Sequence, residues 1–174
     1  MIRNRLASHL VRTCTLIAVV VAVAAAAPGC RWNARREAQA AESMKTTQRL
    51  QTVRSRLWRV TELRGQPVPD DAGITVQLRP DENKVVGNNR VVGSTGVNQY
   101  TGMYKLTPPS ELAFSDIAST RRAGPPDAMA REQAFLNLMD QVRSFEMQEH
   151  ADHRTVELRD AKGKPIMRAM TRDQ

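Results

Sequence analysis

The chain has 174 residues, of which 26 are Lys or Arg and 18 are Asp or Glu, giving a formal net charge of +8 at pH 7. This length favours a single domain. The basic residues occur singly or in short pairs such as Arg35-Arg36 and Arg121-Arg122, without the cation runs and interleaved aromatic residues of a strand-binding surface. We therefore expect no nucleic-acid partner.

Residues 1–29 have the features of an export signal. Arg3, Arg5 and Arg12 form a basic segment without acidic residues, and the apolar run 15–27 follows. This run is shorter than the roughly 20 residues that a membrane-spanning helix needs, so we expect cleavage rather than a permanent span. Without these three arginines the net charge falls from +8 to +5.

Cys30 is the candidate lipidation site. Ala27-Pro28-Gly29-Cys30 resembles the lipobox of bacterial lipoproteins at its last two residues and departs from it at Ala27 and Pro28. We expect a membrane anchor through lipid on Cys30, with the protein on the outer membrane facing the periplasm. Cleavage after the alanine run, giving a soluble periplasmic protein, is the alternative. Cys14 leaves with the signal, so the mature chain has no internal disulfide.

Residues 30–52 read as a polar tether. Residues 31–52 contain no glycine or proline and few apolar residues, a composition that permits partial helix without a stable apolar face. Arg31 and Trp32 are placed to meet a membrane interface beside Cys30. We expect the folded domain to cover residues 53–174.

Short alternating segments separated by turn residues predict a β-rich domain. The expected strands are 57–63, 74–78, 84–92 as a strand pair or a bulged strand, 112–120, 144–147, 155–158 and 166–170. In the first of these, alternation places Trp58, Val60 and Glu62 on one face and Leu63 on the other. We expect Trp58 to be a core residue.

One helix is expected, over residues 127–142. Pro125-Pro126-Asp127 is a helix-start signal, with Asp127 as the candidate N-cap. An apolar stripe follows at helical spacing: Phe135, Leu138, Met139 and Val142. The expected fold is therefore β-rich α+β: an antiparallel sheet or open β-barrel of about eight short strands, with one packed helix over an opening or face.

Residues 91–104 are the most informative stretch. Three glycines stand where positive φ or close backbone approach is expected: Gly93, Gly96 and Gly102. Asn98 suits a turn after Gly96, and Tyr100 and Tyr104 share one face of an extended strand. We interpret the stretch as a tightly turned strand pair with aromatic cover; an ordinary Gly-rich surface loop is the alternative.

Four blocks of the sequence occur in a characteristic order: LWRVTELRGQPV at 57–68, VVGSTGVNQYTGMY at 91–104, LAFSDIASTRRAGPPDAM at 112–129 and EQAFLNLMDQVRSFEM at 132–147. Taken in this order, they resemble the META domain family, which includes a heat-inducible bacterial lipoprotein. The resemblance implies stress-linked roles in the cell envelope and a fold similar to lipoprotein pilots that escort secretin subunits.

The resemblance also suggests residue roles. Residues expected to form the scaffold are Trp58, Gly93, Gly96, Asn98, Tyr100, Gly102 and Tyr104. Thr120 and Arg121 are the candidate exposed polar pair for a partner. Family members often carry two cysteines at the positions of Val97 and Gly124. Their joint replacement here predicts that Val97 and Gly124 lie close in space.

Catalytic and metal-binding patterns are weak. His150 and His153 stand three residues apart beside two acids, but the sequence marks no third ligand, so we expect a polar turn and no metal. Ser94 and Ser119 have no histidine nearby, although a triad assembled across the fold stays open. We expect no catalytic residue, no cofactor and no enzyme activity.

Two functions follow from these patterns. The first is a non-enzymatic envelope lipoprotein whose domain is a stress-linked, protein-binding or pilot-like module, a monomer with an envelope protein partner. The second is a periplasmic carrier of a small apolar ligand or lipid. A carrier needs a cavity inside its barrel, whereas a binding module has a filled core and an exposed groove.

Overall fold

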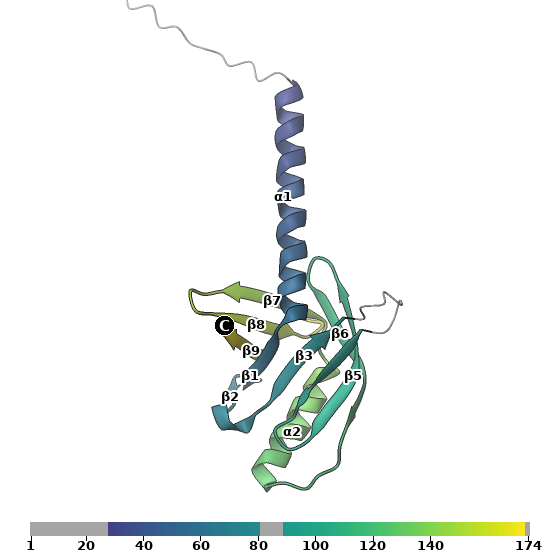
Figure 1. The fold of residues 1–174 in the computed structure, drawn as a ribbon, viewed down its shortest axis with the longest axis vertical. Coiled ribbons are helices and arrows are strands. Elements are labelled where there is room, and N and C mark those ends of the chain that lie inside the picture. The colour runs from purple at the N-terminus through teal and green to yellow at the C-terminus, as the bar shows by residue number, and fades with distance from the viewer. Residues whose placement is uncertain (1–27, 81–88, 173–174) are drawn as a thin grey trace, which may run out of the picture. The chain divides into compact units, whose positions relative to one another are not determined.

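A computed structural model describes residues 28–80 and 89–172 of the chain. The chain is divided into two units after Glu37, and all the strands and the second helix belong to the unit that begins at Ala38. The helices and strands are α1 (Pro28–Ser55), β1 (Leu57–Leu63), β2 (Gln66–Pro67), the 3₁₀ turn η1 (Asp70–Ala72), β3 (Thr75–Arg79), β4 (Arg90–Ser94), β5 (Gln99–Thr107), β6 (Glu111–Ser119), α2 (Pro126–Met139), β7 (Ser144–Glu149), β8 (His153–Arg159) and β9 (Pro165–Arg172), as Figure 1 shows.

The strands form one antiparallel sheet in the order β2-β1-β3-β4-β5-β6-β7-β8-β9. β1 also pairs with β9, so the sheet closes on itself. The two halves of β1 pair with different strands. Residues Leu57 to Arg59 pair with β3, and the residues from Arg59 onward pair with β9. The expected β-rich antiparallel fold is confirmed, with nine strands when the two-residue β2 is counted.

The junction between β6 and β7 is the least paired part of this ring. One residue pair joins the two strands, Glu111 with Ser144. Two backbone bonds flank it: the N–H of Leu112 donates to the carbonyl of Arg143 (3.1 Å), and that of Phe145 donates to the carbonyl of Ser110 (3.0 Å). Every other pair of consecutive strands from β3 to β9 shares at least three residue pairs.

The core fills the inside of the ring. Trp58 is buried as expected, and its indole Nε1 donates to the backbone carbonyl of Val53 in the last turn of α1 (3.0 Å). Leu50 and Val53 belong to the same buried cluster as the strands. The packed region therefore begins with the last two turns of α1, a few residues before the boundary expected from the sequence.

β1 departs from simple alternation. Trp58 and Val60 point inward, but the register with β9 shifts between Val60 and Glu62. After this bulge Leu63 is buried, whereas the Glu62 carboxylate pairs on the outside with Arg168 (3.0 Å). The bulge thus exchanges the faces expected for Glu62 and Leu63 and keeps a carboxylate out of the core.

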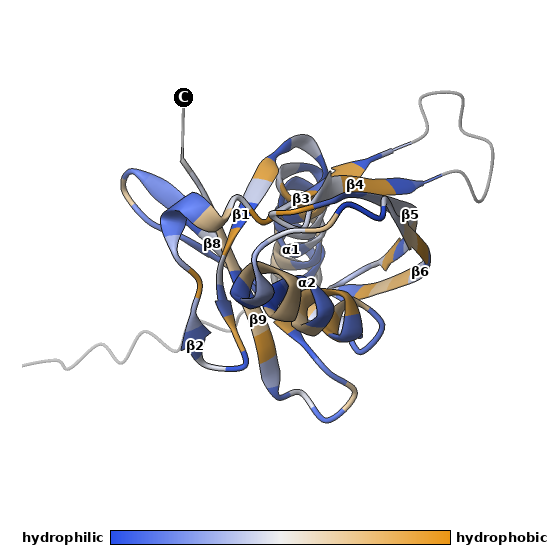
Figure 2. Cartoon of the chain, turned by 90° about the horizontal axis from the view of Figure 1, so that it is seen from below, coloured by the Kyte–Doolittle hydropathy of each residue, from blue (hydrophilic) through white to orange (hydrophobic). Residues whose placement is uncertain are grey.

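α2 lies across one opening of the ring, as Figure 2 shows looking from that side. Phe135, Leu138 and Met139 are buried in the common core. The helix begins one residue earlier than expected, with Pro126 in the first turn and Pro125 as the N-cap, so the assignment of Asp127 as N-cap is wrong. Proline suits this position because the first helical N–H groups have no helical acceptor.

The remaining strand expectations are confirmed with small shifts in their ends. The expected strand pair over 84–92 is represented by β4, whereas positions 84–88 lie outside the described residues.

Candidate functional site

Asn98 is the centre of a buried polar network in the turn between β4 and β5. Its side-chain Oδ1 accepts hydrogen bonds from the Thr120 hydroxyl and from the backbone N–H of Arg122, both at 2.7 Å. Its amide Nδ2 donates to the carbonyl of Arg122 (3.2 Å) and to both carboxylate oxygens of Glu132 (3.0 Å each). One side chain therefore ties together the β4–β5 turn, the end of β6 and helix α2.

Glu132 is the acidic member of this network and is only 6% exposed. Besides Asn98, Thr95 lies against it, with the Thr95 hydroxyl 2.6 Å from Oε2. The Thr95 backbone N–H donates to the Asn98 carbonyl (2.8 Å), which closes the turn. A buried carboxylate is costly unless it is hydrogen-bonded, so these donors make Glu132 a fixing point for α2.

Gly93 and Gly96 allow close backbone approach, as the sequence predicts. A Cβ added at Gly93 would overlap the carbonyl of Thr75 on neighbouring β3. At Gly96, φ is +94°, and a Cβ would overlap the carbonyl of Ala72. Any larger residue would push these backbones apart. Gly102 lies beneath the side chain of Ile117.

Tyr100 and Tyr104 are both buried on the inner face of β5, which confirms that they share a face. The Tyr100 hydroxyl donates to the carbonyl of Thr75 (3.0 Å), and its ring packs against Phe135 of α2 with centroids 5.3 Å apart. Burial raises the pKa of the Tyr100 hydroxyl well above its usual value. Burial also raises the pKa of Tyr104, against the opposing effect of the Arg54 guanidinium.

These buried phenols predict a loss of stability at high pH. A group whose folded pKa is raised contributes its full stability below its unfolded pKa of about 10, and that contribution declines as pH rises above 10, by at most about 1.4 kcal/mol per pH unit for Tyr100. Tyr100→Phe should therefore be less stable than wild type at pH 8, by about 1 kcal/mol for the lost hydrogen bond. Urea unfolding at pH 8, 10 and 11 gives the free energy of unfolding of both proteins, and the difference between them should shrink as pH rises. A difference that stays constant with pH would contradict the raised pKa of Tyr100.

Val97 and Gly124 are in contact, as the joint loss of the family cysteines predicts. A Cβ built on Gly124 would lie 2.8 Å from Cγ1 and 3.6 Å from Cβ of Val97. The latter distance falls within the range of 3.5–4.5 Å that disulfides span between Cβ atoms. The contact fastens the β4–β5 turn to the segment leading into α2.

Thr120 and Arg121, the candidate pair for a partner, differ in their surroundings. Both residues are exposed. The Thr120 hydroxyl is nevertheless committed to the fold, since it donates to Asn98 and accepts from the backbone N–H of Gln99 (3.2 Å). Arg121 makes no side-chain hydrogen bond or ion pair with a described residue and stays a candidate contact residue.

Arg121→Ala should change the free energy of unfolding by less than about 0.5 kcal/mol, because an exposed side chain without internal partners contributes little to stability. Urea unfolding checks this value. Thr120→Val, which removes a hydroxyl bonded to Asn98, is the matched comparison and should cost about 1 kcal/mol or more. A larger loss at Arg121 than at Thr120 would place Arg121 in a structural network.

His150 and His153 flank the turn between β7 and β8, His150 after the end of β7 and His153 at the start of β8. Their rings stack with centroids 4.3 Å apart, while the His153 ring bonds Asp152 and the His150 ring bonds Thr155. Within residues 28–80 and 89–172, no cluster of three or more His, Cys, Asp or Glu side chains is arranged to hold a metal. The sequence expectation of a turn without a metal stays a prediction.

Cys30 lies near the start of α1, and its role as lipid attachment site stays a prediction. The signal segment 1–27 is outside the described residues. No helix in the described part of the chain combines the length and apolar character required to cross a bilayer.

The interior of the ring is filled. A void of about 10 Å³ remains among its apolar side chains, next to Val53, Trp58 and Phe114. That is about the space of one water molecule. In the described conformation the ring therefore has no room for an apolar ligand, which leaves the outer surface as the place for binding.

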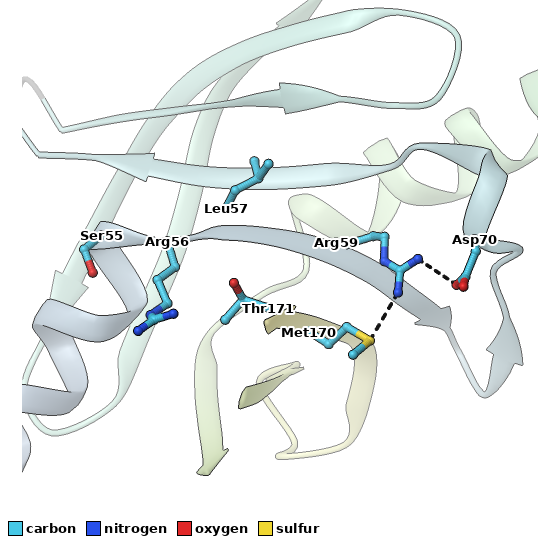
Figure 3. A pocket seen from close by; sticks show the side chains of 7 residues that line it. All are labelled: Ser55, Arg56, Leu57, Arg59, Asp70, Met170 and Thr171. Carbon is cyan, nitrogen blue, oxygen red and sulfur yellow. Dashed lines mark hydrogen bonds and ion pairs between the residues drawn. The ribbon is translucent and has the colours of Figure 1, made fainter. Parts of the chain in front are cut away.

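One surface pocket, of about 790 Å³, lies where β9 separates from the start of β1 (Figure 3). Leu57 is 53% exposed there, an unusual position for a large apolar side chain on this domain. Arg59 forms one wall, and its guanidinium is occupied by Asp70 (2.9 Å) and the Met170 sulfur (3.4 Å), as the dashed lines show. The pocket therefore offers an apolar contact more than a free charge.

A second concavity, of about 860 Å³, runs between α2 and the β1–β2 hairpin and is here called the helix–hairpin groove. Its lining residues are Leu63, Arg64, Gln66, Pro67, Val68, Ala130, Arg131, Ala134, Asn137, Leu138, Asp140 and Gln141. The hairpin turns at Arg64 (φ 49°) and Gly65 (φ 80°). Both central residues of such a two-residue hairpin turn take positive φ, a conformation that glycine or asparagine adopts more readily than arginine.

The sequence did not indicate this groove, although Gly65 and Pro67 mark the end of the first strand. The groove forms where α2 packs beside the β1–β2 hairpin, and a local sequence pattern does not predict this packing. Arg64, which has a positive φ, lies at the edge of this groove.

A closed antiparallel sheet, plugged by one helix and cross-linked by a buried Asn–Glu network, defines a small β-domain. The chain belongs to the META domain family, whose model matches residues 48–173. This is a family of envelope-associated proteins and is not a known enzyme family.

A solved structure supports the fold. An NMR structure of a protein from Burkholderia xenovorans is similar, with 21% sequence identity and a TM-score of 0.54. The similarity covers 71% of this chain and 86% of that one. No curated protein shows significant sequence similarity to the chain.

Proposed function

We propose that this protein is a lipid-anchored protein of the bacterial envelope whose META domain binds a protein partner and has no catalytic role. The observation that carries the proposal is the contrast between the interior, where a space of about 10 Å³ lies among the apolar side chains, and the open concavities on the outer surface, such as the pocket at Leu57 and the helix–hairpin groove. Such a domain has its binding capacity on the outside. The stress-linked role follows from the resemblance to the family.

Two features of the surface support protein binding. Leu57 exposes a large apolar side chain at the pocket of Figure 3, and the helix–hairpin groove exposes Pro67, Ala130 and Ala134. Exposed apolar side chains beside polar ones are common where proteins bind one another. The carrier alternative lacks a comparable observation, because the space found among the described apolar side chains inside the ring, about 10 Å³, is far below ligand size.

The anchor is tested by the intact mass of the full-length chain and its Cys30→Ala variant from membrane fractions. A diacyl or triacyl mass increase that disappears in the variant is expected. Cleavage after the alanine run without lipid would contradict the anchor and leave a free periplasmic domain.

Partner binding is tested by placing a photo-crosslinking amino acid at single positions in the full-length chain, in cells. Ala134 reports on the helix–hairpin groove and Leu57 on the other pocket. Ala161, an exposed alanine in the β8–β9 turn, is the control. We expect a discrete protein adduct from Ala134, Leu57 or both and none from Ala161. Adducts at neither position, or equal adducts at Ala161, would contradict a protein-binding role.

A further inference from the structure

The helix–hairpin groove has an apolar floor that a narrow ligand can approach closely. Leu63, Val68 and Leu138 are buried beneath it. Ala130 and Ala134 stand one helical turn apart on the same face of α2 and are both exposed. Because their side chains are single methyl groups, a main chain can lie along the helix here without obstruction.

Two arginines border this floor from opposite elements. Arg64 comes from the β1–β2 turn and Arg131 from α2. Arg64 donates to the Gln141 side-chain oxygen (2.9 Å) but pairs with no described carboxylate, and Arg131 makes no side-chain bond with any residue in the described part. Both guanidinium groups therefore keep donors for a ligand.

Three arginines on the strands of the ring are, by contrast, paired with carboxylates. Arg59 pairs with Asp70, Arg159 with Glu146 and Arg168 with Glu62. Asp140, the one acidic residue lining the groove, pairs with neither groove arginine. The groove thus carries two cations against one anion, and its charge is complementary to carboxylates.

Arg64 also has an unusual backbone conformation for an arginine, with φ at 49°. Glycine or asparagine would occupy its left-handed backbone position more comfortably. An arginine at this position places a long cationic side chain at the edge of the groove, where its planar fork can bind a carboxylate through two parallel hydrogen bonds.

We propose that the helix–hairpin groove binds an extended peptide segment of the partner protein, in which small apolar side chains are flanked by aspartate or glutamate. The apolar residues lie over Ala130 and Ala134, and the carboxylates pair with Arg64 and Arg131. This inference rests on the proposed protein-binding function and specifies the chemistry of the partner.

The test begins with selection of random nine-residue peptides, displayed on phage, against the full-length chain in detergent. Enriched peptides should combine small apolar residues with Asp or Glu. Fluorescence anisotropy with a labelled enriched peptide then gives the affinity for each variant. Replacing the acidic residues of the peptide by Asn or Gln should weaken binding at least tenfold.

Three substitutions separate binding from folding. Arg131→Ala and Arg64→Gly should each raise Kd at least tenfold, whereas Lys105→Ala, which removes an exposed cation outside the groove, should change it less than twofold. Arg64→Gly also relieves the strained turn, so its Tm should equal or exceed that of wild type. A loss of binding in that variant therefore cannot come from unfolding.

The outcomes distinguish this inference from the proposed function. Enrichment of peptides without acidic residues, no enrichment at all, or affinities unchanged by either arginine substitution would overturn the groove assignment. So would self-association of the chain that Ala134→Leu abolishes, since the occupant would then be a second copy. If Leu57 still gives crosslinks in cells, protein binding stands and only the groove assignment fails.

Discussion

Asn98→Ala should destabilise the domain by about 3 kcal/mol, a large single-residue effect. The substitution leaves the buried Glu132 carboxylate with the Thr95 hydroxyl as its remaining donor, and it removes the acceptor of the exposed Thr120 hydroxyl and of the Arg122 N–H. A lost hydrogen bond to a charged group costs about 1.5–3 kcal/mol, and a lost neutral bond costs about 1 kcal/mol. Urea unfolding followed by circular dichroism gives the free energy.

Two comparison variants make this prediction specific. Asn137→Ala, on the exposed face of α2, should cost less than about 0.5 kcal/mol. Asn98→Asp removes the amide donor and places a second acidic side chain beside Glu132, so this variant should be at least as destabilised at pH 7 as Asn98→Ala. A loss below 1 kcal/mol for Asn98→Ala would show that the network is dispensable.

The double variant Val97→Cys/Gly124→Cys should form a disulfide and raise the stability by about 3 kcal/mol in the chain-entropy account. The Cβ distance of 3.6 Å suits the bond, and Gly124 is free of the left-handed conformation that would strain a cysteine. For a domain of this size the increase in Tm should be about 10 °C. Thermal unfolding with and without reductant, in a Cys14→Ala/Cys30→Ala background, measures it.

The single variants are the controls for the disulfide. Gly124→Cys alone meets the methyl groups of Val97 at 2.8 and 3.0 Å and should be less stable than wild type. Val97→Cys alone replaces two methyl groups by one thiol and leaves room at the contact. It should therefore lose less stability than Gly124→Cys. Free thiols that persist in the oxidised double variant, or a Tm unchanged by reductant, would contradict the geometry.

Local patterns predicted most of the strands but not the faces after a bulge. The bounds of β1 follow from alternation because Trp58 and Val60 need burial at a spacing of two. Alternation alone cannot report the extra residue between Val60 and Glu62, because the bulge depends on the register with β9, about a hundred positions along the chain.

Of the buried network, the sequence indicated Asn98 but not its partner Glu132. The turn chemistry of Gly96 and Asn98 is local, so sequence was sufficient to identify it. The pairing of Asn98 with Glu132 arises only when α2 packs on the ring. Thr120 is a second example of a contact that the sequence did not predict. The residue is exposed, yet its hydroxyl donates a hydrogen bond to Asn98.

The thin junction between β6 and β7 determines where the ring comes apart first. A closed sheet opens at the place where the fewest bonds must break, and here that is one residue pair with two flanking backbone bonds. Amide protons beside this junction, such as those of Leu112 and Phe145, should exchange with solvent ahead of those in the β8–β9 pair. The closed sheet therefore has one weakly paired junction, whereas α2, which precedes β7 in the chain, is held separately through Glu132 and Asn98.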